Sequence, residues 1–131
     1  MLEFDFWQRC ETVRQLLNWA SPDPGRMLDV GGYPGRLRSM IPQHEWVICD
    51  PRVDAAGEQV QGDAAHLPFL DETFDFAVSL DVLEHIGQEH REKVLGEMIR
   101  VSRQGLVLTF PAGSPLVEAA EEKVCQVYKQ L

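Results

Sequence analysis

The chain has 131 residues, which is enough for one hydrophobic core and leaves little for a second. Its composition, 44% apolar and 25% charged, is typical of a globular protein and excludes disordered, collagen-like and coiled-coil classes. Twelve basic and 21 acidic side chains give a net charge of −9, which disfavours contact with a phosphate backbone. We therefore expect one domain over residues 1–131 and no nucleic-acid partner.

Cysteine usage and apolar runs indicate the compartment. Cys10, Cys49 and Cys125 are widely spaced and form no CxxC pair, so neither a disulfide framework nor a four-cysteine zinc site is expected. No apolar run approaches the roughly 20 residues that span a bilayer, and the N-terminus lacks the basic region of a signal peptide. These features favour a cytoplasmic protein with no membrane partner.

Helical and strand patterns alternate along the chain. Apolar residues at three- and four-residue steps predict an amphipathic helix over residues 4–20, which the prolines and glycine of Ser21–Gly25 end. We predict strands at Met27–Val30, Trp46–Cys49, Glu58–Gln61, Phe74–Leu80 and Leu106–Phe110. A long helical pattern separates the last two strands, and another covers residues 116–131. Strands that alternate with helices indicate an α/β protein with a parallel sheet.

A glycine-rich turn, Gly31–Gly35, follows the first predicted strand. Such a turn allows close approach of a ligand, and its free N–H groups can receive a carboxylate or phosphate. The dinucleotide motif GxGxxG does not fit, because its second and third glycine positions hold Tyr33 and Arg36. The turn therefore favours a ligand without a pyrophosphate, with a purely structural strand–helix turn as the alternative.

Acidic residues lie at the ends of four predicted strands: Asp29, Asp50, Asp63 and Asp81. In an open parallel sheet, the crevice beyond the carboxyl ends of the strands binds ligands, and an acid at the end of the second strand can accept ribose hydroxyls. Each aspartate taken singly could equally begin a turn or cap a helix. Together they favour a ligand site.

Three segments in order resemble class I S-adenosylmethionine-dependent methyltransferases of the methyltransferase domain 11 type. The glycine turn is similar to the family's Asp-x-Gly-x-Gly-x-Gly motif, Gly62–Asp75 to its GDA…LPF segment, and Ser79–Ile86 to its signature after strand four. The resemblance implies a doubly wound, Rossmann-like sheet of order 3-2-1-4-5 with an added N-terminal helix. It also implies S-adenosylmethionine as cofactor and S-adenosylhomocysteine as product.

The resemblance assigns the methionine part of the cofactor to four residues. Asp29 would order the loop and bind the ammonium, often through water. Gly31 and Gly35 would let the loop approach the methionine moiety, and Leu80 would supply backbone beside it.

The resemblance assigns the adenosine part of the cofactor to three other residues. Asp50 would bind the ribose diol, while Asp63 and the Ala64 amide would read the adenine edge. A sulfonium, an ammonium and a diol all suit acidic or carbonyl partners. Methyl transfer from a sulfonium needs mainly in-line positioning, so the protein needs no nucleophile, and no catalytic residue or general base is identified.

The expected function is methyl transfer to a small, metabolite-like acceptor, and the alternative is a degenerate, non-catalytic cofactor-binding module. Tyr33 favours the alternative, because it stands where the family has its middle glycine; a positive φ there would strain it and its ring could crowd the methionine part. The connection from Asp50 to Val60 is short for a helical crossover, so we expect a loop or single turn there.

Other residues with metal-binding or aromatic side chains are given structural roles. Asp81, Glu84 and His85 have metal-ligand types at helical spacing, but a helix start is the favoured interpretation and no metal is expected. We expect exposed surface positions for His44, His66 and His90, and core or helix-packing positions for Trp7, Trp19 and Trp46.

The end of the sequence carries a last expectation. The family's antiparallel hairpin after strand five is missing before Leu131, which suggests a truncated or unusually short chain. Strand five would then be an apolar edge without charge or proline, and such edges recruit other strands. We therefore predict a homodimer paired through strand five or the face beside it.

Overall fold

A computed structural model describes residues 3–54 and 58–109 of the chain. Its helices are α1 (Glu3–Ala20), α2 (Arg36–Met40), the short 3-10 helix η1 (Leu83–His85) and α3 (Gln88–Val101). Its strands are β1 (Arg26–Val30), β2 (Glu45–Asp50), β3 (Gln59–Gln61), β4 (Phe74–Leu80) and β5 (Ser102–Thr109). The first predicted helix and all five strands are present, while the helix predicted over 116–131 lies outside the described residues. Among the described helices, none combines the length and apolarity needed to cross a membrane.

The strands form one parallel sheet in the order β3-β2-β1-β4-β5. Val30 of β1 pairs with Cys49 of β2, and Asp29 pairs with Val78 of β4. This confirms the doubly wound order 3-2-1-4-5, and the sheet over the described ranges contains no antiparallel hairpin. Residues 51–54, the described part of the β2–β3 connection after β2, carry no helix, as its short length predicts.

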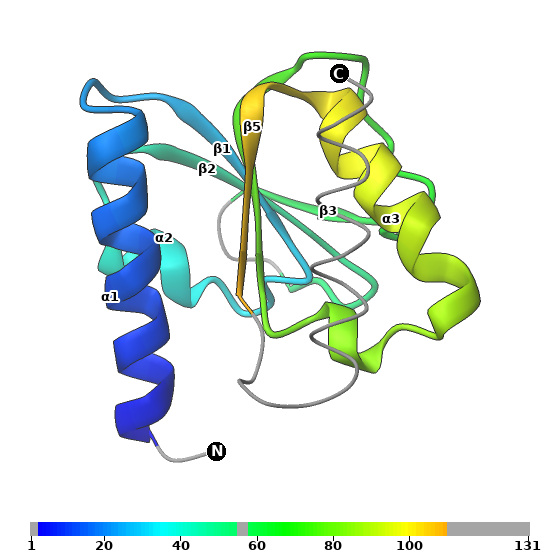
Figure 1. The fold of residues 1–131 in the computed structure, drawn as a ribbon, viewed down its shortest axis with the longest axis horizontal. Helices are drawn as coiled ribbons and strands as arrows, with labels where there is room; N and C mark the ends of the chain where they lie inside the picture. Colours follow the sequence, from blue (N-terminus) through cyan, green and yellow to red (C-terminus); the bar gives the residue numbers. More distant parts are fainter. Residues whose placement is uncertain (1–2, 55–57, 110–131) are drawn as a thin grey trace.

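Helices cover both faces of the sheet, with α1 and α2 on one side and α3 on the other (Figure 1). On the first side, Met27 and Phe76 pack with Leu17 of α1. On the second side, Leu28 packs in the cluster that contains Met98 of α3. Successive strand side chains point to opposite faces, so a continuous apolar strand supplies both layers at once.

The last strand is longer than the sequence indicated. β5 begins at Ser102, whereas the sequence predicted a start at Leu106. The prediction missed the earlier start because Arg103 and Gln104 are polar. Both side chains donate to the carboxylate of Asp75, at 2.6 and 3.4 Å. A search for apolar runs misses such a start, and Phe110 lies outside the described residues. The expectation of a strand five without charge was wrong, because Arg103 lies within β5.

Two tryptophan assignments and one histidine assignment were wrong. Trp46 is buried, but Trp7 is 51% and Trp19 85% exposed, because α1 buries a narrow stripe that includes Val13. His44 is 6% exposed rather than on the surface. Its Nδ1 accepts the Gly25 N–H at 3.0 Å, and burial lowers the pKa of the imidazole.

Candidate functional site

The loops that follow the strands are tied to neighbouring strand ends. The Gly31 N–H donates to the Cys49 carbonyl at 2.8 Å, and the Gly62 N–H donates to the Asp50 carbonyl at 3.2 Å. These bonds hold the loops after β1 and β3 side by side, beyond the carboxyl ends of the strands. Open α/β sheets bind their ligands at this edge.

Two hollows open here, and Gly31 lines both. The first, of about 240 Å³, is called the glycine-loop hollow; its wall includes Phe6, Asp29, Tyr33, Arg36, Leu80 and Asp81. The second, of about 450 Å³, is called the α3 hollow; its wall includes Cys49, Asp63, Ala64, His66, Val82 and Lys93. Of the seven predicted cofactor-binding residues, five line a hollow: Asp29, Gly31, Asp63, Ala64 and Leu80.

The glycine turn is packed tightly against its surroundings. Gly31 has φ +73°, and a Cβ there would lie 2.7 Å from a methyl carbon of Val82. At Gly32 a Cβ would lie 2.0 Å from the carboxylate of Asp29. Gly35 lines neither hollow but immediately precedes α2. Glycine is therefore required where the loop turns and where it closes over Asp29.

Asp29 is a buried carboxylate in the wall of the glycine-loop hollow, with a relative exposure of 2%. Burial, followed by the nearby charge of Asp50, raises the pKa of Asp29 to about 7. Its Oδ1 has no hydrogen-bond partner among the described residues. A buried carboxylate in this condition is stabilised by a cation, so the hollow suits a positively charged group.

Asp50 is buried at the end of β2 but lines neither hollow. Its carboxylate accepts the Tyr33 N–H at 3.2 Å and the Arg52 N–H at 2.9 Å. The Arg52 Nε also lies 3.4 Å from its Oδ1. In this structure the carboxylate holds the glycine turn and the turn after β2, and its contact with ribose stays a prediction.

Tyr33 does not have the strained backbone that a positive φ would impose. Over the described ranges, the non-glycine residues with positive φ are Glu72 and Asp81. The Tyr33 ring lies under the guanidinium of Arg52, with 5.1 Å from its Cζ to the ring centroid. Tyr33 is therefore a wall residue of the glycine-loop hollow, and the positive φ that would have strained it is absent.

Asp63 and Ala64 form part of the wall of the α3 hollow, and their contact with an adenine stays a prediction. The Ala65 N–H donates to Asp63 Oδ1 at 2.9 Å, and this bond lowers the pKa of the Asp63 carboxyl. The Asp63 side chain is exposed. The hollow thus has an ionised hydrogen-bond acceptor at its rim.

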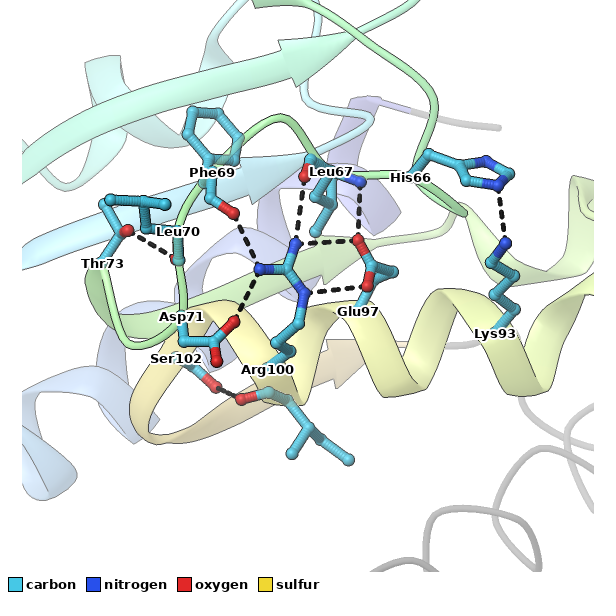
Figure 2. A network of polar contacts seen from close by, with 11 residues as sticks. His66, Leu67, Phe69, Leu70, Asp71, Thr73, Lys93, Glu97, Arg100 and Ser102 are labelled. Atoms are coloured by element: carbon cyan, nitrogen blue, oxygen red, sulfur yellow. Dashed lines mark hydrogen bonds and ion pairs between the residues drawn. The ribbon is translucent and has the colours of Figure 1, made fainter.

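Arg100 fastens the next stretch of chain to α3 (Figure 2). Its guanidinium donates to the carbonyls of Leu67 and Phe69, at 3.1 and 2.8 Å, and to the Asp71 carboxylate at 2.9 Å. Glu97 accepts from Arg100 and also accepts the Leu67 N–H at 2.8 Å. This network fixes the path of the chain that leaves the α3 hollow.

Asp81 is bound to groups of the protein rather than placed for a metal ion. Its Oδ2 lies 2.6 Å from Arg9 Nε of α1, and the Thr109 hydroxyl donates to its Oδ1 at 3.2 Å. Glu84 and His85 lie in η1, in line with the helix-start interpretation. Over residues 3–54 and 58–109, no three His, Cys, Asp or Glu side chains are grouped to hold a metal ion.

The chain matches a known protein family. A family model described as a methyltransferase domain matches residues 28–110, more than half of the chain. The chain belongs to this methyltransferase family. Its match begins within β1 and reaches past β5, so it includes both hollows except for Phe6 of α1.

Two curated methyltransferases are similar to this chain in sequence. The tRNA (carboxymethyluridine(34)-5-O)-methyltransferase of Arabidopsis thaliana is 32% identical over 92 residues, 64% of this chain and 23% of the relative. The norajmaline N-methyltransferase of Rauvolfia serpentina is 43% identical over 75 residues, 53% of this chain and 25% of the relative. The matched part of the chain thus spans a quarter or less of either relative.

A solved structure has a similar fold. The 1,6-didemethyltoxoflavin-N1-methyltransferase of Burkholderia thailandensis, crystallised with 1,6-didemethyltoxoflavin and S-adenosylhomocysteine, matches with a TM-score of 0.64 and 19% identity. The match covers 76% of this chain and 51% of that chain.

Sequence reasoning missed several residues of the candidate site and its support. Phe6 was assigned to the buried face of the first helix, and its place on the apolar stripe gave no sign of the hollow. Arg36 was noted as a mismatch to a glycine motif, although its position beside Gly35 could have indicated a site residue. Val82 directly follows Asp81, which was the available signal for it. Arg100 carried no signal, because its partners lie about thirty residues earlier in the chain.

Proposed function

We propose that this chain is an S-adenosylmethionine-dependent methyltransferase that transfers a methyl group to a small-molecule acceptor. The observation that carries the proposal is the unpartnered Oδ1 of buried Asp29 in the glycine-loop hollow. The methionine part of the cofactor carries an ammonium, the kind of group that this carboxylate lacks. The residues present therefore fit the group that the family implies.

The glycine-loop hollow would hold the methionine part. Asp29 would bind the ammonium, and Gly31 and Gly35 would keep the loop backbone close to the ligand. Leu80, at the end of β4 and in the wall of the same hollow, would supply backbone beside it. The carboxyl ends of β1 and β4 would thus both contribute to this part of the site.

The adenosine part would extend toward the α3 hollow, because Gly31 lines both spaces. Asp63 would accept a hydrogen bond from the adenine edge, and the Ala64 amide would donate one. Asp50 would bind the ribose diol while it continues to hold the glycine turn. These three assignments rest on the resemblance and on the position of each residue at the sheet edge.

When bound, S-adenosylmethionine supplies an activated methyl group, and S-adenosylhomocysteine remains after transfer. The chain's part is to orient that group and exclude competing reactions. Burial raises the pKa of the Cys10 and Cys49 thiols to about 11, so neither is a thiolate at neutral pH. Neither of these two buried thiols would therefore act as a nucleophile at neutral pH.

The small-molecule acceptor is supported by the norajmaline methyltransferase relative and by the net charge of −9. The tRNA-modifying relative favours a second candidate, an RNA acceptor. A third candidate is a non-catalytic cofactor-binding module, which would be supported only if the Tyr33 side chain blocked the glycine-loop hollow.

Calorimetry with S-adenosylhomocysteine tests the proposal directly. We expect saturable binding to the full chain, and Asp50→Asn should bind about tenfold more weakly through loss of a charged acceptor. Absence of binding would refute the cofactor assignment. Methyl transfer from labelled cofactor to a metabolite mixture, compared with total tRNA, would then separate the two acceptor classes.

A further inference from the structure

The outer face of α1 is rich in large apolar side chains. Phe4, Trp7 and Trp19 are 65%, 51% and 85% exposed, and Leu16 is 44% exposed. The rings of Phe4 and Trp7 are stacked, with their centroids 6.4 Å apart. Single exposed apolar residues are common on protein surfaces, but four large ones on the outer side of one helix mark a contact surface.

The same outer face is electrically neutral from Phe6 to Ala20. Every exposed polar residue in this range is uncharged: Gln8, Thr12, Gln15 and Asn18. Glu11 and Arg14 are partly buried and form an ion pair with each other. The chain as a whole has a net charge of −9, so two copies repel one another. A neutral apolar face is therefore a place where a second copy can approach at low electrostatic cost.

The outer face is also symmetric about its middle. Phe4 and Trp19 lie at its two ends, and Gln8 and Gln15 each lie four residues further in. At 3.6 residues per turn these four residues fall within about 60° of the helix circumference, so they form one narrow stripe. An antiparallel pair of such helices brings Phe4 beside the partner's Trp19 and Gln8 beside the partner's Gln15. This pairing has the two-fold symmetry of most homodimers.

We propose that the outer face of α1 is a dimerisation surface that pairs, in antiparallel orientation, with α1 of a second copy of this chain. α1 lies on the outside of one face of the sheet, so a second helix can lie along it (Figure 1). Trp7 and Leu16 would flank the stripe, and the glutamines would form neutral polar contacts near its centre. Tryptophan is enriched among the residues that contribute most to protein interfaces.

A lipid surface matches this face less well. Helices that lie on anionic membranes carry lysine and arginine beside their apolar residues, and no exposed residue from Phe6 to Ala20 is basic. A second copy also has a consequence for the candidate site. Because α1 carries Phe6 of the glycine-loop hollow and Arg9, the ion-pair partner of Asp81, pairing would hold in place a helix that borders the hollow.

Sedimentation velocity of the full chain over a concentration series tests the proposal. We expect a monomer–dimer equilibrium, and Trp19→Glu should raise the dissociation constant at least about tenfold, because the change occurs twice in a two-fold dimer. Leu70→Glu is the matched control. It adds the same charge at an 83% exposed leucine between β3 and β4, so it should dimerise as the parent does. An unchanged circular dichroism spectrum of Trp19→Glu separates lost pairing from lost folding.

Disulfide cross-linking tests the orientation of the two helices. A mixture of Gln8→Cys and Gln15→Cys should form a mixed disulfide, because these positions are neighbours in the antiparallel pair. Gln8→Cys alone should form no more disulfide than the parent, since its two copies would lie about 10 Å apart along the helices. A disulfide between two copies of Gln8→Cys would indicate parallel helices and overturn the proposed orientation.

Two other results would overturn the dimer itself. The first is a parent that stays monomeric at high concentration; if that monomer also sediments with phosphatidylcholine vesicles and Trp19→Glu does not, the outer face of α1 binds lipid instead. The second is a dimer that Trp19→Glu and the parent form equally well. Pairing through β5 would give that second result, because it uses backbone N–H and C=O groups at the sheet edge and not Trp19.

Discussion

Replacement of Asp29 by asparagine should change how the stability of the ligand-free protein depends on pH. The pKa of Asp29 is raised from 3.8 to about 7, first by burial and then by the charge of Asp50. The folded state therefore binds more protons than the unfolded state between about pH 4 and pH 7. In that window the free energy of unfolding must fall as pH rises, because ionising the buried carboxyl costs more than ionising the exposed one.

The size of the effect follows from the shift. About three pKa units at about 1.4 kcal/mol each give roughly 4 kcal/mol of stability lost across the window. Asp29→Asn carries no titrating group, so its stability should lack this fall. The difference between parent and variant isolates Asp29 from other groups such as His44, which both proteins share.

Urea denaturation at half-unit steps from pH 4 to pH 8 measures the difference. Asp50→Asn is the matched control, because it removes the second cause of the shift and should move the fall toward lower pH without abolishing it. If the parent and Asp29→Asn show parallel pH profiles, Asp29 is ionised normally and the case for an unsatisfied carboxylate is lost. S-adenosylhomocysteine should bind the parent more tightly as pH rises toward 7, since its ammonium favours the ionised carboxyl.

Three other predictions concern the support of the site and the sheet edge. Glu97→Gln weakens the bonds to Arg100 and Leu67, so the free energy of unfolding should fall by about 1.5–3 kcal/mol. Urea denaturation measures this loss, with the exposed Glu89→Gln as control. A urea midpoint equal to that of the control would contradict the prediction. Tyr33→Gly relieves no backbone strain and increases the conformational freedom of the unfolded chain. Thermal denaturation should therefore show a free energy of unfolding lower by about 0.5–1 kcal/mol. A variant more stable than the parent would indicate that Tyr33 is strained. Two copies should pair through β5, the edge strand of the described sheet, and sedimentation velocity that shows only monomer at high concentration would contradict the pairing.

The sheet could be predicted because its strands carry strong local signals. Runs such as Trp46–Cys49 are apolar on consecutive positions, which requires burial on both faces and hence helices on both sides. The glycine turn after Val30 marked the edge where loops gather. Where polar side chains served a strand, as at Arg103, the signal failed and the boundary was misplaced.

The candidate site was predictable in position but not in its pairings. Asp29 and Leu80 were assigned to the methionine part of the cofactor and Asp63 to the adenine edge. Asp29 and Leu80 line the glycine-loop hollow and Asp63 lines the α3 hollow, while the contacts of all three with a ligand stay predictions. Sequence could not show that Arg9 reaches across to Asp81, because contacts between distant segments depend on how α1 lies on the sheet. Those pairings decide which charges a ligand meets.

The four aspartates at the strand ends differ in their hydrogen-bond and ion-pair partners. These partners, rather than the number of aspartates, determine which charge a ligand would meet. Asp50 accepts backbone N–H groups, Asp63 accepts the N–H of Ala65, and Asp81 is matched by Arg9. Asp29 is the buried one that keeps an oxygen without a partner among the described residues. A cluster of acids would attract any cation, whereas a single unsatisfied carboxylate inside a small hollow attracts a cation of limited size whose remaining groups fit the wall. The loops and α1 thus supply partners for three of the acids and leave Asp29 open, and this difference would give the proposed site its selectivity for an ammonium-bearing ligand.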